Sequence, residues 1–240
     1  MKNRRKMSAL RFFRNLLGAL FGIAVITLMI VWYQYYQMNS YNEQIEKLVV
    51  LNKEKDSAES EMIDGEGIEN LLTDSGLYLP QIDFEALKEI NENTVGWIYA
   101  CDGKISYPIV ASPDEFYLEH AIDGTSSKAG TIFVNSNPEE AFPGNRSIIY
   151  GHNMRDGSMF HSLLQYWRDS SYLEKFPYIY VITENTTYTY EITSVYVAEY
   201  KDIIFTTNTD QNEDKIIDLI TCEYSGKDTR LVVEAVESKN

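Results

Sequence analysis

The stretch LITCEYSGKDTRLVV (residues 219–233) holds a short apolar run that ends at a cysteine, a polar segment, and a second apolar run that begins at an arginine. This pattern is typical of two antiparallel strands joined by a turn. If Cys222 and Arg230 face each other across the turn, their Cβ atoms lie roughly 4.5–5.5 Å apart on one face of the hairpin. The stretch therefore predicts a hairpin that places a thiol beside a guanidinium.

The alternation of side chains along a strand sorts the rest of this hairpin into two faces. One face is apolar and suits a core: it sets Ile217, Leu219 and Thr221 opposite Leu231, Val233 and Ala235. The other face suits the floor of a half-open cleft: it carries Cys222 and Arg230 together with Asp218, Ile220, Val232 and Glu234.

Short β-rich runs separated by turn residues continue upstream of this hairpin. They are VGWIYA and KISYPIV, which flank a Cys-Asp-Gly-Lys turn, then GTIFVN, RSIIYGH, YIYVITE and YTYEITSVYVAEY, with IIDLITC and RLVVEAV in the hairpin itself. A short helix capped by Asp83 precedes them, and helical pieces intervene near PDEFYLEH, GSMFHSLLQYW and SSYLEKF. Eight short strands with few helices predict a mainly β fold, a closed or nearly closed barrel.

The N-terminus has the composition of a membrane anchor. Residues 1–15 are basic and lack acidic residues, and an apolar run without charge, Leu16 to Trp32, leads into an aromatic cluster. A run of this length is near the lower limit for crossing a bilayer. A cleavable signal peptide is the alternative, but the bulky residues after Ile30 do not fit its cleavage pattern. We expect a transmembrane signal-anchor at 16–36, with the basic tail cytoplasmic and the remainder extracellular.

The part outside the membrane is strongly acidic. Apart from the six cations of the N-terminal tail, the chain has 15 Lys and Arg against 36 Asp and Glu. This charge repels nucleic acid and excludes it as a partner. Residues 37–76 are polar, with a fading helical pattern broken by glycines, and are predicted to form an extracellular stalk. The catalytic domain is expected at 77–240.

A lone thiol is a weak nucleophile near neutral pH, so Cys222 needs a proton-transfer partner. The chain has three histidines. His161 and His120 lie in predicted helical pieces, where structural roles are expected. His152 ends the run RSIIYGH, after a glycine expected to let the backbone turn. In this arrangement Cys222 attacks a carbonyl, His152 gives a proton to the leaving group, and Arg230 stabilises the oxyanion.

The chain order of the site residues narrows the enzyme class. Papain-like and NlpC-type peptidases have their cysteine before their histidine, whereas here His152 precedes Cys222. The sequence resembles the class B sortases in the segments IIYGHNMRDGSMFHSLLQY (148–166), DKIIDLITCEY (214–224) and RLVVEA (230–235). Further segments fit in the same order: NENTVGWIYA, YPIV, FYLEHAIDG and AGTIFVN. The resemblance covers roughly residues 80–237.

This resemblance implies an eight-stranded sortase β-barrel that performs transpeptidation. Cys222 would cleave the Thr-x bond of an NP-x-T-like C-terminal sorting signal and form a thioacyl enzyme, with His152 as acid/base and Arg230 as stabiliser. An amine, usually of a peptidoglycan precursor, would then resolve the intermediate and anchor the surface protein to the cell wall. Thr221, just before the nucleophile, is a further candidate for substrate binding. No residue spacing points to a metal, and no cofactor is expected.

The chain departs from the family pattern at two strand positions and in one loop. Asp218 stands where the family usually has Thr, and Ile220 where Ser is common. Residues 201–215 replace a longer insertion and are too short for its usual helix and flanks, although this loop helps to form the sorting-signal groove. The shortened loop leaves open a pilin polymerase with a lysine acceptor. A non-catalytic stalked binding module and a cysteine endopeptidase are further alternatives.

Overall fold

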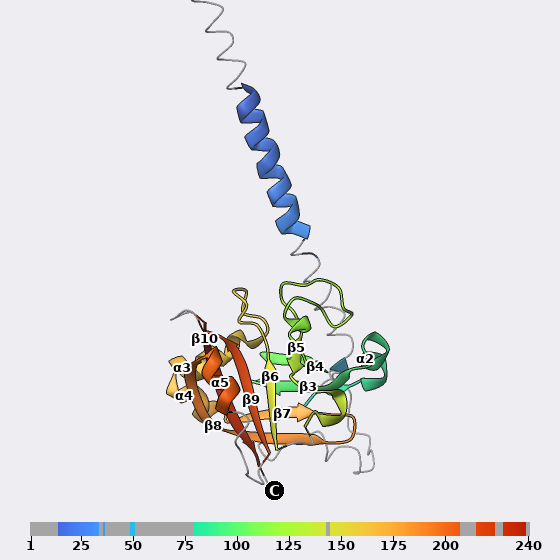
Figure 1. Ribbon diagram of the computed structural model, residues 1–240, viewed down its shortest axis with the longest axis vertical. Helices are drawn as coiled ribbons and strands as arrows, with labels where there is room; N and C mark the ends of the chain where they lie inside the picture. Colours follow the sequence, from blue (N-terminus) through green and yellow to red (C-terminus); the bar gives the residue numbers. More distant parts are fainter. Residues whose placement is uncertain are drawn as a thin grey trace, which may run out of the picture. The chain divides into compact units, whose positions relative to one another are not determined.

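The strands of this chain close into a barrel (Figure 1). The structure is a computed structural model that describes residues 14–33, 36, 49–50, 79–142, 145–206, 215–223 and 228–238. Among these residues eight strands form the closed barrel, in the order β10-β8-β7-β3-β4-β5-β6-β9, and pairing of β9 with β10 completes the ring. The predicted eight-stranded barrel is confirmed, and closure leaves none of its strands as an unpaired edge.

The eight barrel strands coincide with the eight predicted runs. They are β3 (Thr94–Ala100), β4 (Ile105–Ala111), β5 (Ile132–Val134), β6 (Arg146–Tyr150), β7 (Tyr178–Ile182), β8 (Thr187–Glu199), β9 (Ile216–Cys222) and β10 (Thr229–Glu237). The predicted β3–β4 hairpin forms around a turn at Cys101 to Lys104. Two pairings are parallel, β4 with β5 and β6 with β9, and the other six are antiparallel.

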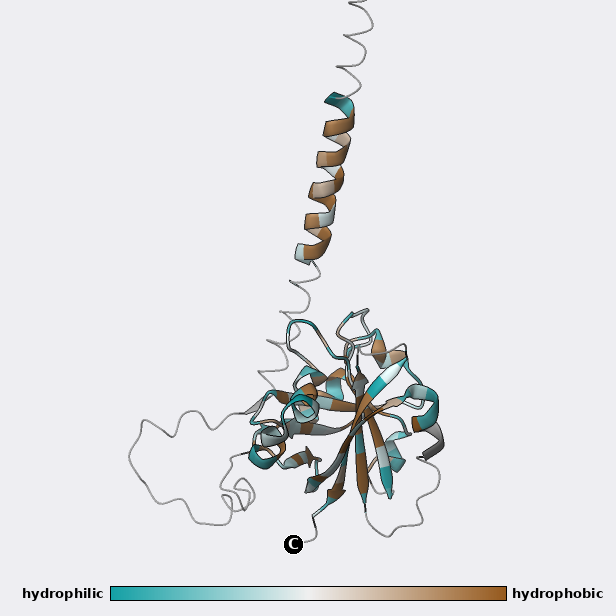
Figure 2. Ribbon diagram, turned by 90° about the vertical axis from the view of Figure 1, so that its left-hand side faces the viewer, coloured by the Kyte–Doolittle hydropathy of each residue, from teal (hydrophilic) through white to brown (hydrophobic). Residues whose placement is uncertain are grey.

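The N-terminal unit, Met1–Glu46, contains a helix from Arg14 to Tyr33. With 20 residues, this helix is long enough and apolar enough to cross a membrane. Figure 2 shows hydrophobic residues along its length. The second unit, Lys47–Asn240, begins within the predicted stalk, of which the structure describes two residues. These residues form β1 (Val49–Val50), which pairs with β2 (Gln81–Ile82), and the rest of the stalk lies outside the described residues.

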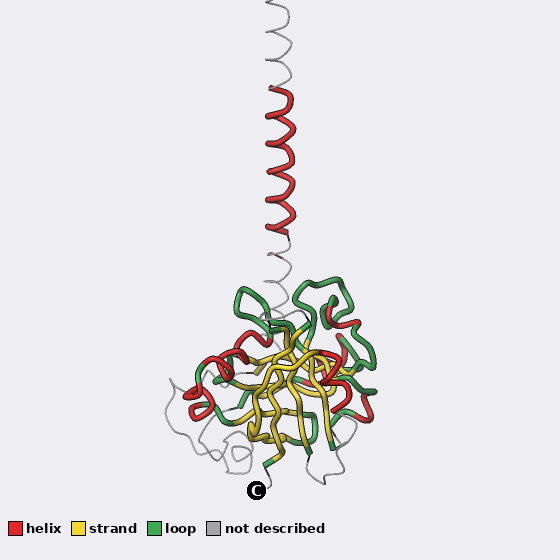
Figure 3. The backbone as a smooth tube through the Cα atoms, turned by 60° about the vertical axis from the view of Figure 1, so that its left-hand side comes forward, coloured by secondary structure: helices red, strands yellow, loops and turns green. Residues whose placement is uncertain are grey.

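Short helical segments lie around the strands (Figure 3). They are α2 (Phe84–Ile90), η1 (Phe116–Leu118), η2 (Pro138–Glu140), η3 (Phe160–Leu163), α3 (Leu164–Arg168), α4 (Ser170–Lys175) and α5 (Tyr200–Thr206). The predicted helix at α2 is confirmed, with the Asp83 carboxylate accepting a hydrogen bond from the Ala86 N–H. Such a cap satisfies one of the amide groups that a helix leaves unpaired at its start.

Helix α5 lies in the segment that was expected to be too short for the family's helix. A helix of seven residues, Tyr200–Thr206, forms at the start of this segment. Residues 207–214 lie outside the described residues, so the expectation about the family's longer helix stays a prediction. Ile203 of α5 is buried against Ile220 of β9 and Val232 of β10, and this contact places α5 over these two strands (Figure 1). The burial of Ile203 anchors a helix that is too short to be stable alone.

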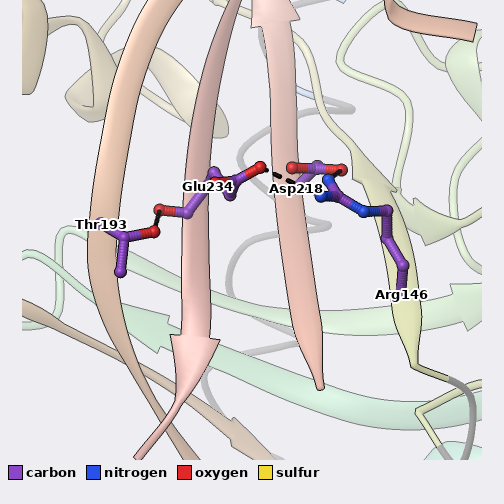
Figure 4. A network of polar contacts seen from close by, with 4 residues as sticks. All are labelled: Arg146, Thr193, Asp218 and Glu234. Carbon is purple, nitrogen blue, oxygen red and sulfur yellow. Dashed lines mark hydrogen bonds and ion pairs between the residues drawn. The ribbon is translucent and has the colours of Figure 1, made fainter. Parts of the chain in front are cut away.

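An ion network ties three neighbouring strands together on the outer face of the barrel (Figure 4). Arg146 of β6 donates to the carboxylate of Asp218 on β9 at 2.5 Å and to that of Glu234 on β10 at 3.1 Å. Asp218 is only 1% exposed. Its carboxylate is tolerated at this depth because a guanidinium neutralises it, which accounts for an acidic residue where the sequence pattern leads one to expect threonine.

Candidate active site

The strand register places Cys222 directly opposite Arg230 at the end of the β9–β10 ladder. The predicted hairpin register is confirmed along its whole length: Thr221 faces Leu231, Ile220 faces Val232, Leu219 faces Val233, Asp218 faces Glu234 and Ile217 faces Ala235. Beyond the last pair, the Glu223 N–H donates to the Thr229 carbonyl at 3.2 Å. This bond fixes the two strand ends next to the thiol and the guanidinium.

The face that carries Cys222 is less open than the sequence indicated. Ile220 and Val232 are 1% and 0% exposed, because they pack with Ile203 of α5 and with side chains of the neighbouring strands β6 and β8. The predicted half-open cleft therefore does not extend along this face. Cys222 itself is partly exposed, which leaves the end of the strand accessible to a substrate.

His152 follows β6, two residues after Tyr150, which pairs with Ile220 of β9. Its Nε2 donates to the Leu118 carbonyl at 2.7 Å, because a carbonyl oxygen can only accept. This bond leaves Nδ1 as the ring nitrogen that can gain and lose a proton. The pKa of His152 is raised, chiefly by hydrogen bonding with the Cys222 side chain and against the opposing effect of burial.

Two glycines make the position of His152 possible. At Gly151 a Cβ atom would lie 2.4 Å from Ile132 and 2.7 Å from Phe160, so this residue is needed for close packing. Its φ is not in the left-handed region, so the requirement for glycine that the structure shows here is close packing and not a positive φ. At Gly130, where φ is +62°, a Cβ would lie 2.7 Å from the Leu118 carbonyl oxygen, which is the partner of His152.

The thiol of Cys222 has a lowered pKa. Hydrogen bonding with His152 contributes most, and the positive charges of Arg230 and His152 add to it, while partial burial acts in the opposite direction. A thiol with a depressed pKa in a partly exposed, electropositive site is typical of reactive cysteines. The three residues that the sequence singled out thus influence one another in the structure.

Arg230 is held beside the thiol by a carbonyl and an aromatic ring. Its Nη1 donates to the Thr229 carbonyl at 3.1 Å, and its guanidinium lies 5.0 Å from the ring centroid of Tyr200. The Tyr200 hydroxyl in turn donates to the Glu115 carboxylate at 2.7 Å. A guanidinium held in this way keeps its positive charge available to a developing oxyanion.

The other residues considered from the sequence lie elsewhere or make structural contacts. Thr221 is 2% exposed, points to the face opposite Cys222, and its hydroxyl makes no hydrogen bond with the described residues. His120 stacks on Phe116, with ring centroids 3.8 Å apart. Cys101 is buried beside the Tyr166 hydroxyl, and its burial raises the pKa of its thiol. The substrate-binding role of Thr221 stays a prediction.

Sequence reasoning missed three groups that hold the site. The Leu118 carbonyl is a backbone group, so no side-chain pattern could point to it. Tyr200 ends a strand pattern and gives no local sign that it covers Arg230. Asn153, next to His152 in the sequence, donates from Nδ2 to the Cys222 carbonyl at 2.9 Å, and its proximity to the histidine was the signal that could have identified it.

Metal ligation finds no support in the part of the chain that the structure describes. Within those residues no group of three or more His, Cys, Asp and Glu side chains could hold a metal ion.

The sequence of this chain matches a known protein family. The model of the sortase domain matches residues 101–238. Sortase B of Listeria monocytogenes is 39% identical over 111 residues, a match that spans 46% of this chain but less than half, 45%, of that protein.

Solved structures resemble the barrel as well. Sortase B of Clostridium perfringens has a TM-score of 0.57 and 26% identity, covering 65% of this chain and 100% of that one. A Staphylococcus aureus sortase B–substrate complex has a TM-score of 0.53 and 26% identity, covering 65% of this chain and 84% of that one.

Proposed function

This chain belongs to the sortase family, whose members are cysteine transpeptidases, and we propose that it attaches surface proteins to cell-wall peptidoglycan. In this proposal it cleaves the Thr-x bond of an NP-x-T-like C-terminal sorting signal and transfers the threonine carbonyl to an amine of a peptidoglycan precursor. The proposal is supported chiefly by the register that sets Cys222 opposite Arg230, and by the lowered pKa of the Cys222 thiol, to which His152 and Arg230 both contribute.

The first half-reaction forms a thioacyl enzyme. The Cys222 thiolate attacks the threonine carbonyl carbon, and the carbonyl oxygen becomes an oxyanion that the Arg230 guanidinium stabilises. The C–N bond then breaks, its electron pair stays on the leaving nitrogen, and the His152 imidazolium supplies the proton that this nitrogen needs. The raised pKa of His152 and the lowered pKa of Cys222 support this assignment, because both shifts favour the charged forms.

The second half-reaction transfers the acyl group to the acceptor. A neutral amine attacks the thioester carbonyl, and the neutral His152 takes the proton that the amine loses on forming an amide. The C–S bond breaks and returns the electron pair to the Cys222 sulfur as thiolate. The cycle restores the starting protonation state and changes no oxidation state, so it consumes neither an oxidant nor a reductant.

The N-terminal helix suits an enzyme that works at the cell envelope. We infer that Arg14–Tyr33 spans the membrane with the basic tail on the cytoplasmic side, because positive residues are retained there during insertion. The barrel would then be extracellular, where sorting signals emerge and peptidoglycan precursors are available.

The proposal can be tested with the full-length protein in detergent micelles. It is incubated with a library of sorting pentapeptides of the form Asn-Pro-x-Thr-x, with triglycine, with a lysine-containing peptide, or without an amine. Mass spectrometry detects the cleaved peptide, the amine-ligated product and the acyl adduct on Cys222. Cys222→Ala is the control for cysteine dependence.

The outcomes separate the candidate functions. Ligation to triglycine that disappears in Cys222→Ala supports cell-wall anchoring, and ligation to the lysine peptide alone would assign a pilin polymerase instead. Cleavage without any rate gain from amine would indicate an endopeptidase. Neither cleavage nor adduct across the library would contradict the proposed activity and favour a non-catalytic binding module.

A further inference from the structure

The residues on both sides of His152 hydrogen-bond to strand β9. Before it, the Gly151 N–H donates to the Ile220 carbonyl at 3.1 Å. After it, the Asn153 side-chain amide donates to the Cys222 carbonyl at 2.9 Å. The acid/base and the nucleophile are therefore tied together through two bonds that bracket the histidine, and the second of them ends on the nucleophile's own main chain.

The Asn153 amide replaces a bond that the barrel would otherwise make with its backbone. Strands β6 and β9 run parallel, and their pairing ends at Tyr150 and Ile220. In a parallel ladder every second residue of one strand donates to the partner, so the donor after Gly151 would be the Asn153 N–H and its acceptor the Cys222 carbonyl. In this structure the Cys222 carbonyl accepts from the Asn153 side-chain amide, and the Asn153 main chain lies in an isolated antiparallel bridge with Met159.

His161 fixes the direction in which this amide points. Its Nδ1 lies 2.8 Å from the Asn153 Oδ1 and donates to it, since an amide oxygen accepts only. With Oδ1 engaged, the Nδ2 group is directed to Cys222. Asn153 is 6% exposed, so water competes little for either bond.

The loop that carries these residues closes on itself. His161 belongs to η3, and the neighbouring Phe160 N–H donates to the His152 carbonyl at 2.8 Å. The Met159 N–H donates to the Tyr107 hydroxyl at 3.0 Å, which attaches the loop to β4. His152, Asn153 and His161 are thus held in one frame against the barrel wall.

We propose that Asn153 and His161 are positioning residues for transpeptidation, which hold the Cys222 main chain at a fixed distance from His152. The inference rests on the proposed function for its kinetic part. Cys222 is the last paired residue of β9, so without this bond the end of the strand loses a restraint on the side that faces His152. Displacement of a reacting group by about 1 Å can lower a rate about 100-fold.

The test compares variants of the full-length protein in detergent. Asn153→Ala removes the donor, Asn153→Asp keeps the shape but presents an acceptor to the Cys222 carbonyl, and His161→Phe removes the bond to Asn153. His161→Gln keeps a donor within reach of the Asn153 oxygen and serves as the rescue. Asn137→Ala, an exposed asparagine that contacts Glu140, is the matched control.

Two readouts are taken for each variant, together with its thermal midpoint. One is kcat and KM for ligation of a sorting peptide to triglycine. The other is the pH dependence of iodoacetamide alkylation at Cys222, read on the peptide that contains it, which requires no sorting substrate. This second readout reports the His152–Cys222 interaction because that interaction lowers the pKa of the thiol.

We expect Asn153→Ala and Asn153→Asp to lower kcat about 10- to 100-fold with little change in KM, and to move the alkylation profile to higher pH. His161→Phe shifts both readouts in the same direction, and His161→Gln restores them. Native kcat and a native alkylation profile in folded Asn153→Ala and Asn153→Asp would overturn the inference. An inactive wild type with a shifted profile in the variants would overturn the transpeptidase proposal but support the positioning role.

Discussion

The outer face of strands β6, β9 and β10 carries two arginines with different partners. One is paired with two carboxylates, and the other lies beside a thiol. At one end Arg146 lies between the carboxylates of Asp218 and Glu234. At the other end Arg230 lies opposite Cys222. Asp218 and Cys222 point to the same face of β9 and are four residues apart, which is about 13 Å along a strand.

The partners of each guanidinium decide what its charge does. Arg146 is neutralised by two carboxylates, so its charge maintains the packing of three strands. Arg230 donates to a carbonyl and lies over the ring of Tyr200, and its charge contributes to the lowered pKa of Cys222. Arg146 is therefore part of a structural ion network, whereas Arg230 maintains an electropositive site beside the thiol.

Removing the arginine of the structural end should have the largest effect on stability. Arg146→Met leaves the Asp218 carboxylate buried without its guanidinium, which costs about 3–5 kcal/mol in comparable buried pairs. We expect a correspondingly lower free energy of unfolding in urea, followed by circular dichroism of the full-length protein. At pH 7 the alkylation rate of Cys222 per folded molecule should be unchanged.

The double variant Arg146→Met/Asp218→Leu is the control for this prediction. Replacing both members of a buried ion pair by apolar side chains is often nearly neutral, so most of the lost stability should return. If the double variant is as unstable as Arg146→Met, packing of the arginine side chain, and not the orphaned carboxylate, explains the loss.

Removing the arginine of the reactive end should affect catalysis and leave folding nearly intact. Arg230→Gln is expected to lower kcat about 100- to 1,000-fold, the range found when one oxyanion donor is lost. The pKa of Cys222 should rise, so that alkylation requires higher pH, because the Arg230 charge favours the thiolate.

Arg230→Lys refines this test, since it keeps the charge but loses the planar fork. We expect a nearly native alkylation profile together with a lowered kcat. If Arg230→Lys instead shifts the alkylation profile to higher pH as far as Arg230→Gln does, the geometry of the guanidinium, and not its charge alone, controls the pKa of the thiol.

Gly151 lies between the last residue of β6, Tyr150, and the site residue His152. Gly151→Ala places a methyl group 2.4 Å from Ile132 and 2.7 Å from Phe160. Overpacking of this kind typically costs about 1–3 kcal/mol, and here it should also move His152. Urea unfolding measures the loss of stability. The kcat of the variant relative to the wild type, at equal concentrations of folded protein, measures the displacement of His152. An unchanged kcat would indicate that Ile132 and Phe160 shift to make room for the methyl group.

The sequence predicted the hairpin end of the site better than the histidine end. Cys222 and Arg230 are joined by a short connection, so strand alternation and the turn set their register without knowledge of the rest of the fold. His152 reaches them through the parallel pairing of β6 with β9, which joins residues about 70 positions apart. Its contacts with the Leu118 carbonyl and its neighbour's bond to Cys222 depend on tertiary structure, and no local pattern encodes them.

The packing of α5 over β9 and β10 could not be predicted from local sequence patterns either. The near-continuous apolar run of β9 indicates burial on both faces, but not which element supplies the outer cover. Part of that cover is α5, which lies in a segment that was expected to be too short for the family's usual helix. The close packing at Gly151 was not predicted from the sequence, because its near neighbours Ile132 and Phe160 are distant or follow a loop in the sequence.

The coupling of the two titrating groups gives a prediction with a definite sign. Hydrogen bonding with Cys222 is the main cause of the raised pKa of His152, so Cys222→Ala should lower this pKa. In the variant the imidazolium loses its proton at lower pH than in the wild type. Titration of the His152 ring protons by NMR measures the shift, with His120 as an internal control, and an unchanged midpoint would contradict the coupling.

The smallest effect is expected at Thr221, which lies next to Cys222 but on the inner face. Its hydroxyl is buried without a hydrogen bond to the described residues, and a buried unsatisfied hydroxyl costs about 1–3 kcal/mol. Thr221→Val replaces it with a methyl group of similar size, so the thermal midpoint should be equal or slightly higher and KM for the sorting peptide unchanged. A raised KM at unchanged stability would instead assign Thr221 the substrate contact that the sequence predicted, and would require the inner end of β9 to open toward the substrate.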